Sequence, residues 1–114
     1  MSLFNLNNKS ILITGSSRGI GKSIARHCAI HGANVIISSR KLNICEQTAD
    51  QINNEVGKEL AHPISASISD ENQLDELVKK TREKLGKIDV LICNAATNPF
   101  MGSMLDMPND KFDK

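Results

Sequence analysis

The stretch ITGSSRGIGKS at residues 13–23 places three glycines within seven positions, directly after a run of aliphatic side chains. The run SILIT (10–14) predicts a buried strand, and from Gly19 onward the apolar spacing becomes helical. A glycine-rich turn between a strand and a helix brings backbone N–H groups and the positive end of the helix dipole to one place. This stretch therefore predicts a binding site for a phosphate group.

Short aliphatic runs continue to alternate with helical patterns along the chain. Further strands are predicted at 34–38, 62–67 and 88–93, and each intervening helix ends at a glycine. This βαβαβαβ order predicts an α/β fold, a doubly wound parallel sheet with helices on both faces. Its ligand crevice is expected beyond the carboxyl ends of the strands.

The details of the helices give further expectations. In the first helix Ile20, Ile24 and Cys28 are predicted to form the apolar face. Asn43 is predicted to cap the second helix. The segment after residue 94 is predicted to be a loop, with a helix beginning near Asn109.

Length, net charge and cysteine content limit the classes of protein to which this chain can belong. The 114 residues fit one domain, and a formal net charge of +1 gives no field that would recruit nucleic acid or an anionic membrane. No apolar run is long enough to span a bilayer, and the start of the chain lacks a secretory pattern. Three cysteines, an odd number, indicate free thiols in a reducing compartment, so we expect a cytoplasmic protein without nucleic-acid or membrane partners.

Two kinds of loop place glycines between a strand and a helix. Gly21-Lys22-Ser23 matches the end of the ATP-binding pattern G-x-x-x-x-G-K-[ST], but its first glycine would fall at Ser16. The spacing present is T-G-x-x-x-G-x-G, from Thr14 to Gly21, and it resembles the cofactor motif of the short-chain dehydrogenases/reductases. An ATP-binding loop remains the alternative at this point.

Other segments extend this resemblance over the N-terminal half of a family member. NAA (94–96) stands where the family has N-N-A-G, and SSRK (38–41) ends the second predicted strand. NPFMG (98–102) resembles a carbonyl-reductase subgroup. Cys93 and Ala96 depart from the family motif. The resemblance implies a Rossmann-type fold and assigns these residues to the cofactor: Gly15, Ser17, Arg18, Gly19, Ile20, Gly21, Ser39, Arg40, Lys41, Ser67, Ile68, Asn94 and Ala95.

The residue pattern also favours one nicotinamide cofactor. An NAD site carries Asp or Glu about 20 residues after the glycines, where this chain has Ser39. Arg40 and Lys41 follow, and Arg18 lies within the glycine loop. Because a guanidinium binds phosphate strongly, we expect NADP(H), with NAD(H) as the alternative. The three cations could instead be ordinary solvated surface charges.

The family's catalytic Tyr, Lys, Ser and Asn have no counterparts here, and the chain contains no tyrosine. By resemblance, residues 1–114 are the NADP(H)-binding half of a Rossmann domain, with no catalytic residue and no metal site. The full enzyme would act on a carbonyl or alcohol and form a homo-oligomer. A short protein that only binds nucleotide, or that works with a partner, is the alternative. We expect the isolated chain to be inactive and, with its 89–93 strand an exposed edge, to self-associate.

Overall fold

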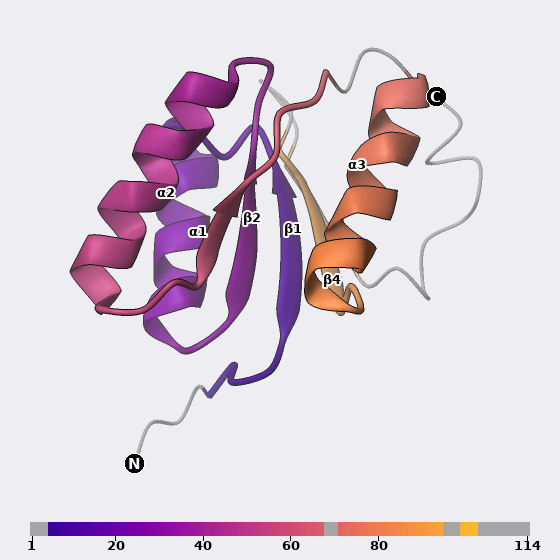
Figure 1. Cartoon of the computed structure of the whole chain (residues 1–114). Coiled ribbons are helices and arrows are strands. Elements are labelled where there is room, and N and C mark those ends of the chain that lie inside the picture. The colour runs from indigo at the N-terminus through magenta and orange to yellow at the C-terminus, as the bar shows by residue number, and fades with distance from the viewer. Residues whose placement is uncertain (1–4, 68–70, 95–98, 103–114) are drawn as a thin grey trace.

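The computed structural model describes residues 5–67, 71–94 and 99–102, which form one sheet with helices on both faces (Figure 1). The strand order is β3-β2-β1-β4-β5. Strands β1 to β4 are parallel to one another, as predicted. The elements are β1 (Ser10–Thr14), α1 (Gly19–Ile30), β2 (Asn34–Ser38), α2 (Leu42–Val56), β3 (Ala61–Pro63), α3 (Glu71–Leu85), β4 (Val90–Asn94) and β5 (Pro99–Gly102).

The central strands β1 and β2 are buried on both faces, which is why the three middle residues of each are aliphatic. Successive side chains of β1 alternate between two clusters. Ile11 and Ile13 pack with α1 and α2, whereas Leu12 packs with Leu77 of α3 on the opposite face. Figure 1 shows the same division, with α1 and α2 on one side of the sheet and α3 on the other. The doubly wound α/β architecture is thus confirmed.

The buried face of α1 differs from the predicted one. Its buried residues are Gly21, Ala25 and Ala29, and the side chain of Ile20 is 64% exposed. Ile24 and Cys28 only flank the core. Small residues let the helix axis approach the strands closely, so the helix is turned relative to the orientation that the larger aliphatics indicate. Ile20 is consequently free to face the carboxyl edge of the sheet.

The predicted start of α2 is two residues late. The helix begins at Leu42, and its N-cap is Lys41, which makes no side-chain capping bond, so Asn43 is not the cap. The end is as predicted, because Gly57 lies in the left-handed region, with φ +76°, and its N–H bonds the carbonyl of Asn53. The predicted helix near Asn109 lies outside the described residues.

Strand β3 is shorter than the predicted 62–67 and depends on a side chain of α2. The Asn53 amide accepts the N–H groups of Leu60 and Ala61, at 2.9 and 2.8 Å, and donates to the carbonyl of Ala61 at 2.9 Å. Beyond Pro63, the N–H of Ile64 bonds the carbonyl of Ile37 in β2, and the N–H of Ala66 bonds the carbonyl of Ser39, which follows β2.

The expectation that the fourth strand is a sheet edge is wrong. Strand β5, within the segment predicted to be a loop, pairs with β4 in antiparallel register from Asn94↔Pro99 to Leu91↔Gly102. The outer strands of the described sheet are therefore β3 and β5. Both are short and contain a proline, and these are features that hinder pairing with another chain. Among the described helices, none has the length and apolar character needed to cross a bilayer.

Candidate functional site

The loop between β1 and α1 presents backbone at the carboxyl edge of the sheet. Gly15 and Gly19 both have left-handed backbone, with φ +61° and +64°, which allows two sharp turns within five residues. Apart from the adjacent residues and the backbone of its own helix, a methyl group added at Gly19 would meet no heavy atom of the described chain within 4 Å. The space in front of this backbone is therefore open, as a phosphate site requires.

The N-terminus of α1 has the electrostatics of an anion site. Its N-cap, Arg18, makes no side-chain capping bond, and the first turn contains no acidic residue. The early N–H groups of a helix have no partner within the helix, and together with the dipole they favour a negative charge. The predicted cofactor residues Gly19, Ile20 and Gly21 form this first turn, with Ile20 exposed and Gly21 buried toward the sheet.

Two buried hydroxyl groups, which sequence reasoning did not assign to the site, fix the loop in place. Ser16 is fully buried; its Oγ donates to the carbonyl of Ile13 at 2.7 Å and accepts the N–H of Ser38 at 2.7 Å. Thr48 of α2 donates from Oγ1 to the carbonyl of Ser17 at 2.8 Å. The glycine loop is thus attached to β2 on one side and to α2 on the other.

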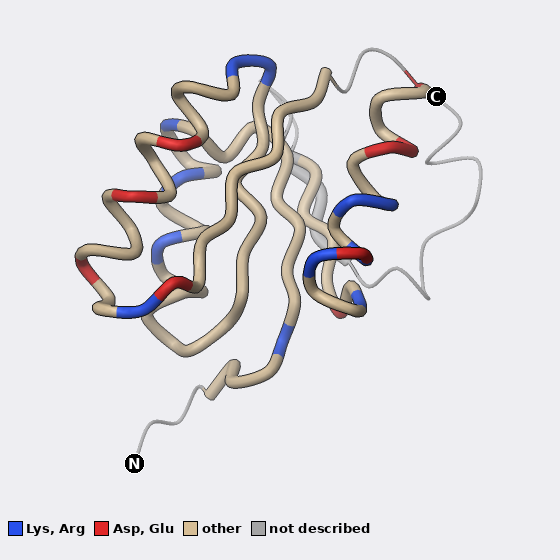
Figure 2. Tube along the Cα trace, in the orientation of Figure 1, with Lys and Arg blue, Asp and Glu red and all other residues tan. Residues whose placement is uncertain are grey.

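Basic side chains gather beside this loop. Arg40 and Lys41 form the turn between β2 and α2, which is blue in Figure 2, and both are exposed, as is Arg18. The ion pairs of the described residues are Arg26–Glu55 and Lys87–Asp89, so none of these three cations is paired with a described carboxylate. They remain available to an anionic ligand.

The structure also brings the predicted adenine-side residues together. Ser39 follows β2, and its carbonyl accepts the N–H of Ala66 at 2.9 Å, which places the segment ending at Ser67 beside it. The N–H of Ser67 donates to the Gln73 side chain at 2.7 Å. Ile68, the other predicted residue here, lies outside the described residues.

The remaining predicted positions lie at the end of β4. Cys93 is in register with Thr14, so Asn94 and Gly15 follow neighbouring residues of adjacent parallel strands. Asn94 is the last residue of β4, and Ala95 lies outside the described residues. The described candidate residues therefore lie at one edge of the sheet, the edge at the carboxyl ends of its parallel strands.

Contacts of the ATP-type residues point away from a triphosphate site. The Lys22 ammonium, which such a loop would direct at phosphate, donates to the Gln51 side chain of α2 at 2.6 Å. Asp89 lies before β4, at the amino edge of the sheet, where its carboxylate accepts the N–H of Ser10 at 2.7 Å. This bond, more than the neighbouring Lys87, holds the pKa of Asp89 below its usual value. Asp89 thus has a structural role, and it lies at the opposite edge of the sheet from the glycine loop, too far to hold a magnesium ion for a triphosphate bound there.

Other titratable groups also have structural roles. Burial raises the pKa of the Cys28 and Cys93 thiols, which keeps them protonated near neutral pH. The ring Nδ1 of His31 lies 2.8 Å from the carbonyl of His27, at the end of α1. The described residues contain no group of three or more His, Cys, Asp or Glu that could hold a metal ion.

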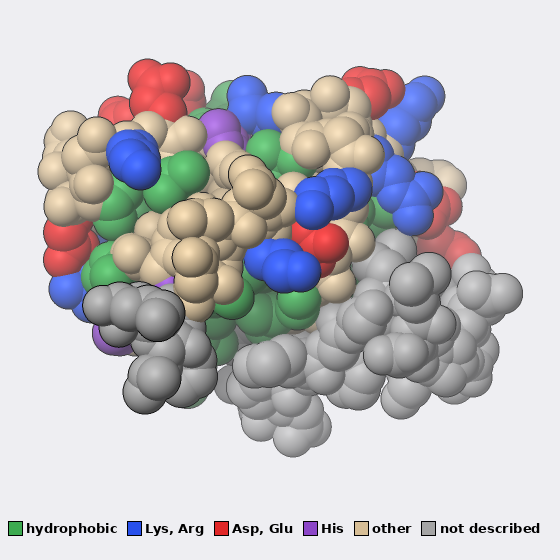
Figure 3. Space-filling view, turned by 90° about the horizontal axis from the view of Figure 1, so that it is seen from below, with side chains coloured by type: hydrophobic (Ala, Val, Ile, Leu, Met, Phe, Trp, Pro, Cys, Tyr) green, Lys and Arg blue, Asp and Glu red, His purple; other side chains and the backbone are tan. Residues whose placement is uncertain are grey.

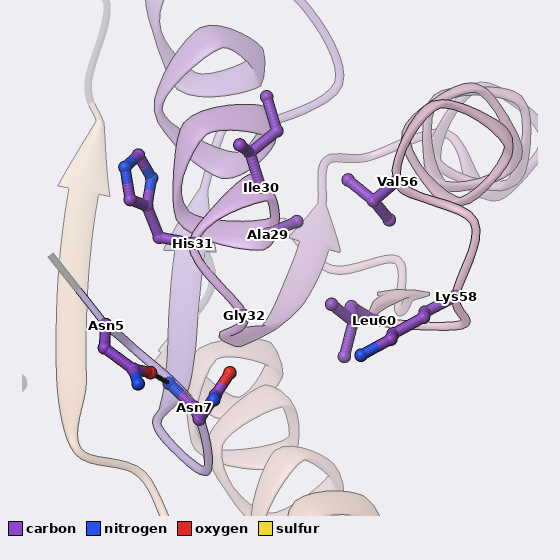
Figure 4. A pocket seen from close by; sticks show the side chains of 9 residues that line it. All are labelled: Asn5, Asn7, Ala29, Ile30, His31, Gly32, Val56, Lys58 and Leu60. Atoms are coloured by element: carbon purple, nitrogen blue, oxygen red, sulfur yellow. Dashed lines mark hydrogen bonds between the residues drawn. The ribbon is translucent and has the colours of Figure 1, made fainter. Parts of the chain in front are cut away.

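A pocket of about 390 Å³ lies at the opposite edge of the sheet, and the sequence did not predict it (Figure 4). Its lining comes from segments that precede strands or end helices: Asn5, Asn7, Ala29, Ile30, His31, Gly32, Val56, Lys58 and Leu60. Figure 3, viewed from this edge, shows acidic and basic side chains interspersed, without a broad area of one sign. This pocket is separate from the candidate site.

Comparison with known proteins gives a family for this architecture. The family model described as short chain dehydrogenase matches residues 9–114. "Dehydrogenase/reductase SDR family member 4" from Bos taurus is 36% identical over 109 residues, which are 96% of this chain and 38% of that protein. The chain spans about two-fifths of the length of the curated relatives it matches.

Solved structures agree with this assignment. A Pseudomonas aeruginosa RhlG/NADP active-site complex aligns with a TM-score of 0.74 at 34% identity, covering 82% of this chain and 37% of that one. A 3-ketoacyl-(acyl-carrier-protein) reductase from Brucella melitensis, complexed with NADH, aligns with a TM-score of 0.69 at 34% identity, covering 76% and 34%. The neighbours therefore include complexes with either nicotinamide cofactor.

Proposed function

Because the chain belongs to the short-chain dehydrogenase family, we propose that residues 1–114 are the NADP(H)-binding half of an oxidoreductase that interconverts a carbonyl and an alcohol. The activity is inferred from relatives that are longer than this chain, since the chain spans about two-fifths of their length. In that whole enzyme the cofactor would carry the hydride, and this half would bind and orient it.

The glycine loop supplies the pyrophosphate site in this proposal. Gly15 allows the turn after β1, and the open space in front of Gly19 admits the phosphates to the N–H groups at the start of α1. Ile20 is exposed at the same edge and would cover an apolar part of the ligand. Ser39, Ser67 and Ile68 would flank the adenosine, and Asn94 and Ala95 would border the cofactor at the end of β4.

One observation carries the choice of NADP(H) over NAD(H). Arg40 and Lys41 directly follow Ser39, the position where an NAD site has its acidic residue, and neither is paired with a described carboxylate. Arg18 adds a third exposed cation from the glycine loop. A carboxylate at this place would repel a 2′-phosphate, whereas guanidinium and ammonium groups bind it.

The family resemblance assigns the proton transfer to a tyrosine, and this chain has none, so the proton that a carbonyl gains on reduction would come from a residue outside this half. We therefore expect the 114-residue protein to bind cofactor and to show no reductase activity. The alternative is a protein that only binds the nucleotide, or that completes a site with a partner chain. It would bind the cofactor through the same residues.

The substitution Arg40→Ala tests the cofactor choice. We expect it to weaken NADPH binding by about 1–3 kcal/mol, the contribution of a charge-assisted hydrogen bond, and to leave NADH binding unchanged. Calorimetric titration with both cofactors measures this difference. Arg82→Ala on α3 is the matched control, because it removes the same charge from the opposite face of the sheet. Equal losses for NADPH and NADH would show that Arg40 does not read the 2′-phosphate.

A further inference from the structure

Helix α2 contacts both loops of the proposed cofactor site through two buried side chains. The Oγ1 of Thr48 donates to the carbonyl of Ser17 at 2.8 Å, and the Sγ of Cys45 lies 3.2 Å from the Oγ of Ser39. Thr48 is 3% exposed and Cys45 is fully buried. The two residues are three apart and so share one face of the helix. One helical turn therefore touches the loop after β1 and the loop after β2.

The bond from Thr48 is not the one that a helical threonine ordinarily makes. A threonine in a helix commonly bonds the carbonyl four residues earlier, as Thr81 of α3 does with Leu77 at 2.8 Å. Thr48 instead reaches Ser17, 31 positions away in the sequence. Its hydroxyl group thus links two elements instead of satisfying its own helix.

Further polar contacts continue this link along the two helices. Lys22 bonds Gln51 at 2.6 Å, and the guanidinium of Arg26 binds the carboxylate of Glu55 through two bonds, at 2.5 and 2.6 Å. These two contacts involve exposed side chains, whereas the contact of Thr48 is the buried one at the loop itself. Thr48 therefore holds the point at which the loop enters α1.

The planarity of the peptide bond gives this contact a consequence for the phosphate site. The carbonyl of Ser17 and the N–H of Arg18 belong to one rigid peptide group and point in opposite directions. Directing the carbonyl toward Thr48 therefore directs the N–H of Arg18 away from α2. The same bond limits rotation of the peptide between Ser17 and Arg18, which directly precedes the left-handed Gly19.

We propose that Thr48 is a positioning residue of the dinucleotide site: its hydroxyl holds the Ser17 carbonyl, and thereby orients the backbone N–H groups that receive the pyrophosphate. This inference rests on the proposed function, because it assigns the ligand of the glycine loop. Thr48 itself does not touch the ligand. Its removal should weaken every ligand that carries the pyrophosphate, whatever the substituent on the ribose.

Two substitutions separate the hydroxyl from the shape of the side chain. Thr48→Val keeps the volume and loses the hydrogen bond, and Thr48→Ser keeps the hydroxyl. We expect Thr48→Val to weaken NADPH and NADH by the same factor, about fivefold, which is the effect of one net hydrogen bond. The binding of 2′-AMP, which has the 2′-phosphate but no pyrophosphate, should stay within twofold. Thr48→Ser should bind all three ligands like the unaltered chain.

Backbone ¹⁵N relaxation of the ligand-free chain provides a measurement that does not depend on affinity. In Thr48→Val the order parameters of the Arg18 and Gly19 N–H groups should fall, while those of β1 and β2 stay unchanged. Arg40→Ala should give the converse ligand pattern, with NADPH and 2′-AMP weakened and NADH unchanged.

Three results would overturn the inference. Thr48→Val could bind NADPH and NADH as tightly as the unaltered chain, or Thr48→Ser could be as weak as Thr48→Val, which would mean that packing alone matters. The order parameters of the Arg18 and Gly19 N–H groups could also stay unchanged. Failure of the proposed function gives a different result, since the unaltered chain itself would then bind neither NADPH nor NADH.

Discussion

At the scale of single residues, the candidate site depends on backbone more than on side chains. Gly19 combines left-handed backbone with open space in front of it, and Gly57, at the end of α2, has the same two properties far from the site. Comparing substitutions at the two glycines therefore separates the effect of backbone strain from the effect of ligand contact. Any side chain at either position is strained to a similar extent.

We expect Gly19→Ala and Gly57→Ala each to lower the free energy of unfolding by about 1 kcal/mol, because alanine disfavours positive φ. Gly19→Ala should also weaken NADPH binding at least tenfold, since the methyl group would occupy the place of the phosphate. Gly57→Ala should bind NADPH normally. Urea unfolding and calorimetric titration of both variants provide the comparison. Tight NADPH binding by the Gly19 variant would mean that the phosphate lies elsewhere.

At the scale of elements, the sequence predicted the features that depend on residues nearby in the chain. The aliphatic runs gave β1 and β2 their observed bounds, and the glycines placed the helix ends. It missed β5, because Pro99 and Gly102 are typical of loops when read alone. The four-residue spacing also favoured Ile20 for the core, whereas the close approach of α1 to the sheet selected the small residues next to it.

Contacts between distant segments could not be predicted in this way. Thr48 meets Ser17, and Ser16 meets Ser38, only because the crossovers through α1 and α2 bring the loops together. The sequence gives each residue type but not its partner. That the predicted cofactor positions share one edge of the sheet could be predicted, because they follow the ends of strands. The contacts that support the glycine loop could not be predicted.

The attachment of β3 to α2 gives a prediction at this scale. Asn53→Ala removes three bonds to Leu60 and Ala61, so we expect a loss of about 3 kcal/mol in the free energy of unfolding, because buried backbone groups lose their partners. The neighbouring Asn54 is exposed and makes no such bonds. Asn54→Ala should therefore be neutral or slightly stabilising, by about 0.5 kcal/mol. Equal effects in chemical denaturation would show that Asn53 does not hold β3.

At the scale of the whole molecule, β5 changes what is expected of the isolated chain. Self-association was expected through an exposed fourth strand, but β5 covers the edge of β4. We now expect the 114-residue chain to remain monomeric, and a chain ending before Pro99 to associate, because its longer aliphatic strand would become the edge. Size-exclusion chromatography with light scattering over a range of concentrations compares the two. A shorter chain that stays monomeric at every concentration would show that β5 does not protect this edge.

The central claim is that the carboxyl edge of this half-sheet binds NADP(H). Titration of isotope-labelled protein with NADPH, followed by amide NMR shifts, tests it most directly, because it reports where the ligand binds. We expect shifts at Gly15 to Gly21 and at Ser39 to Lys41, and none at the opposite pocket around Asn7 and Lys58. Shifts confined to that pocket, or no shifts at saturating NADPH, would contradict this claim.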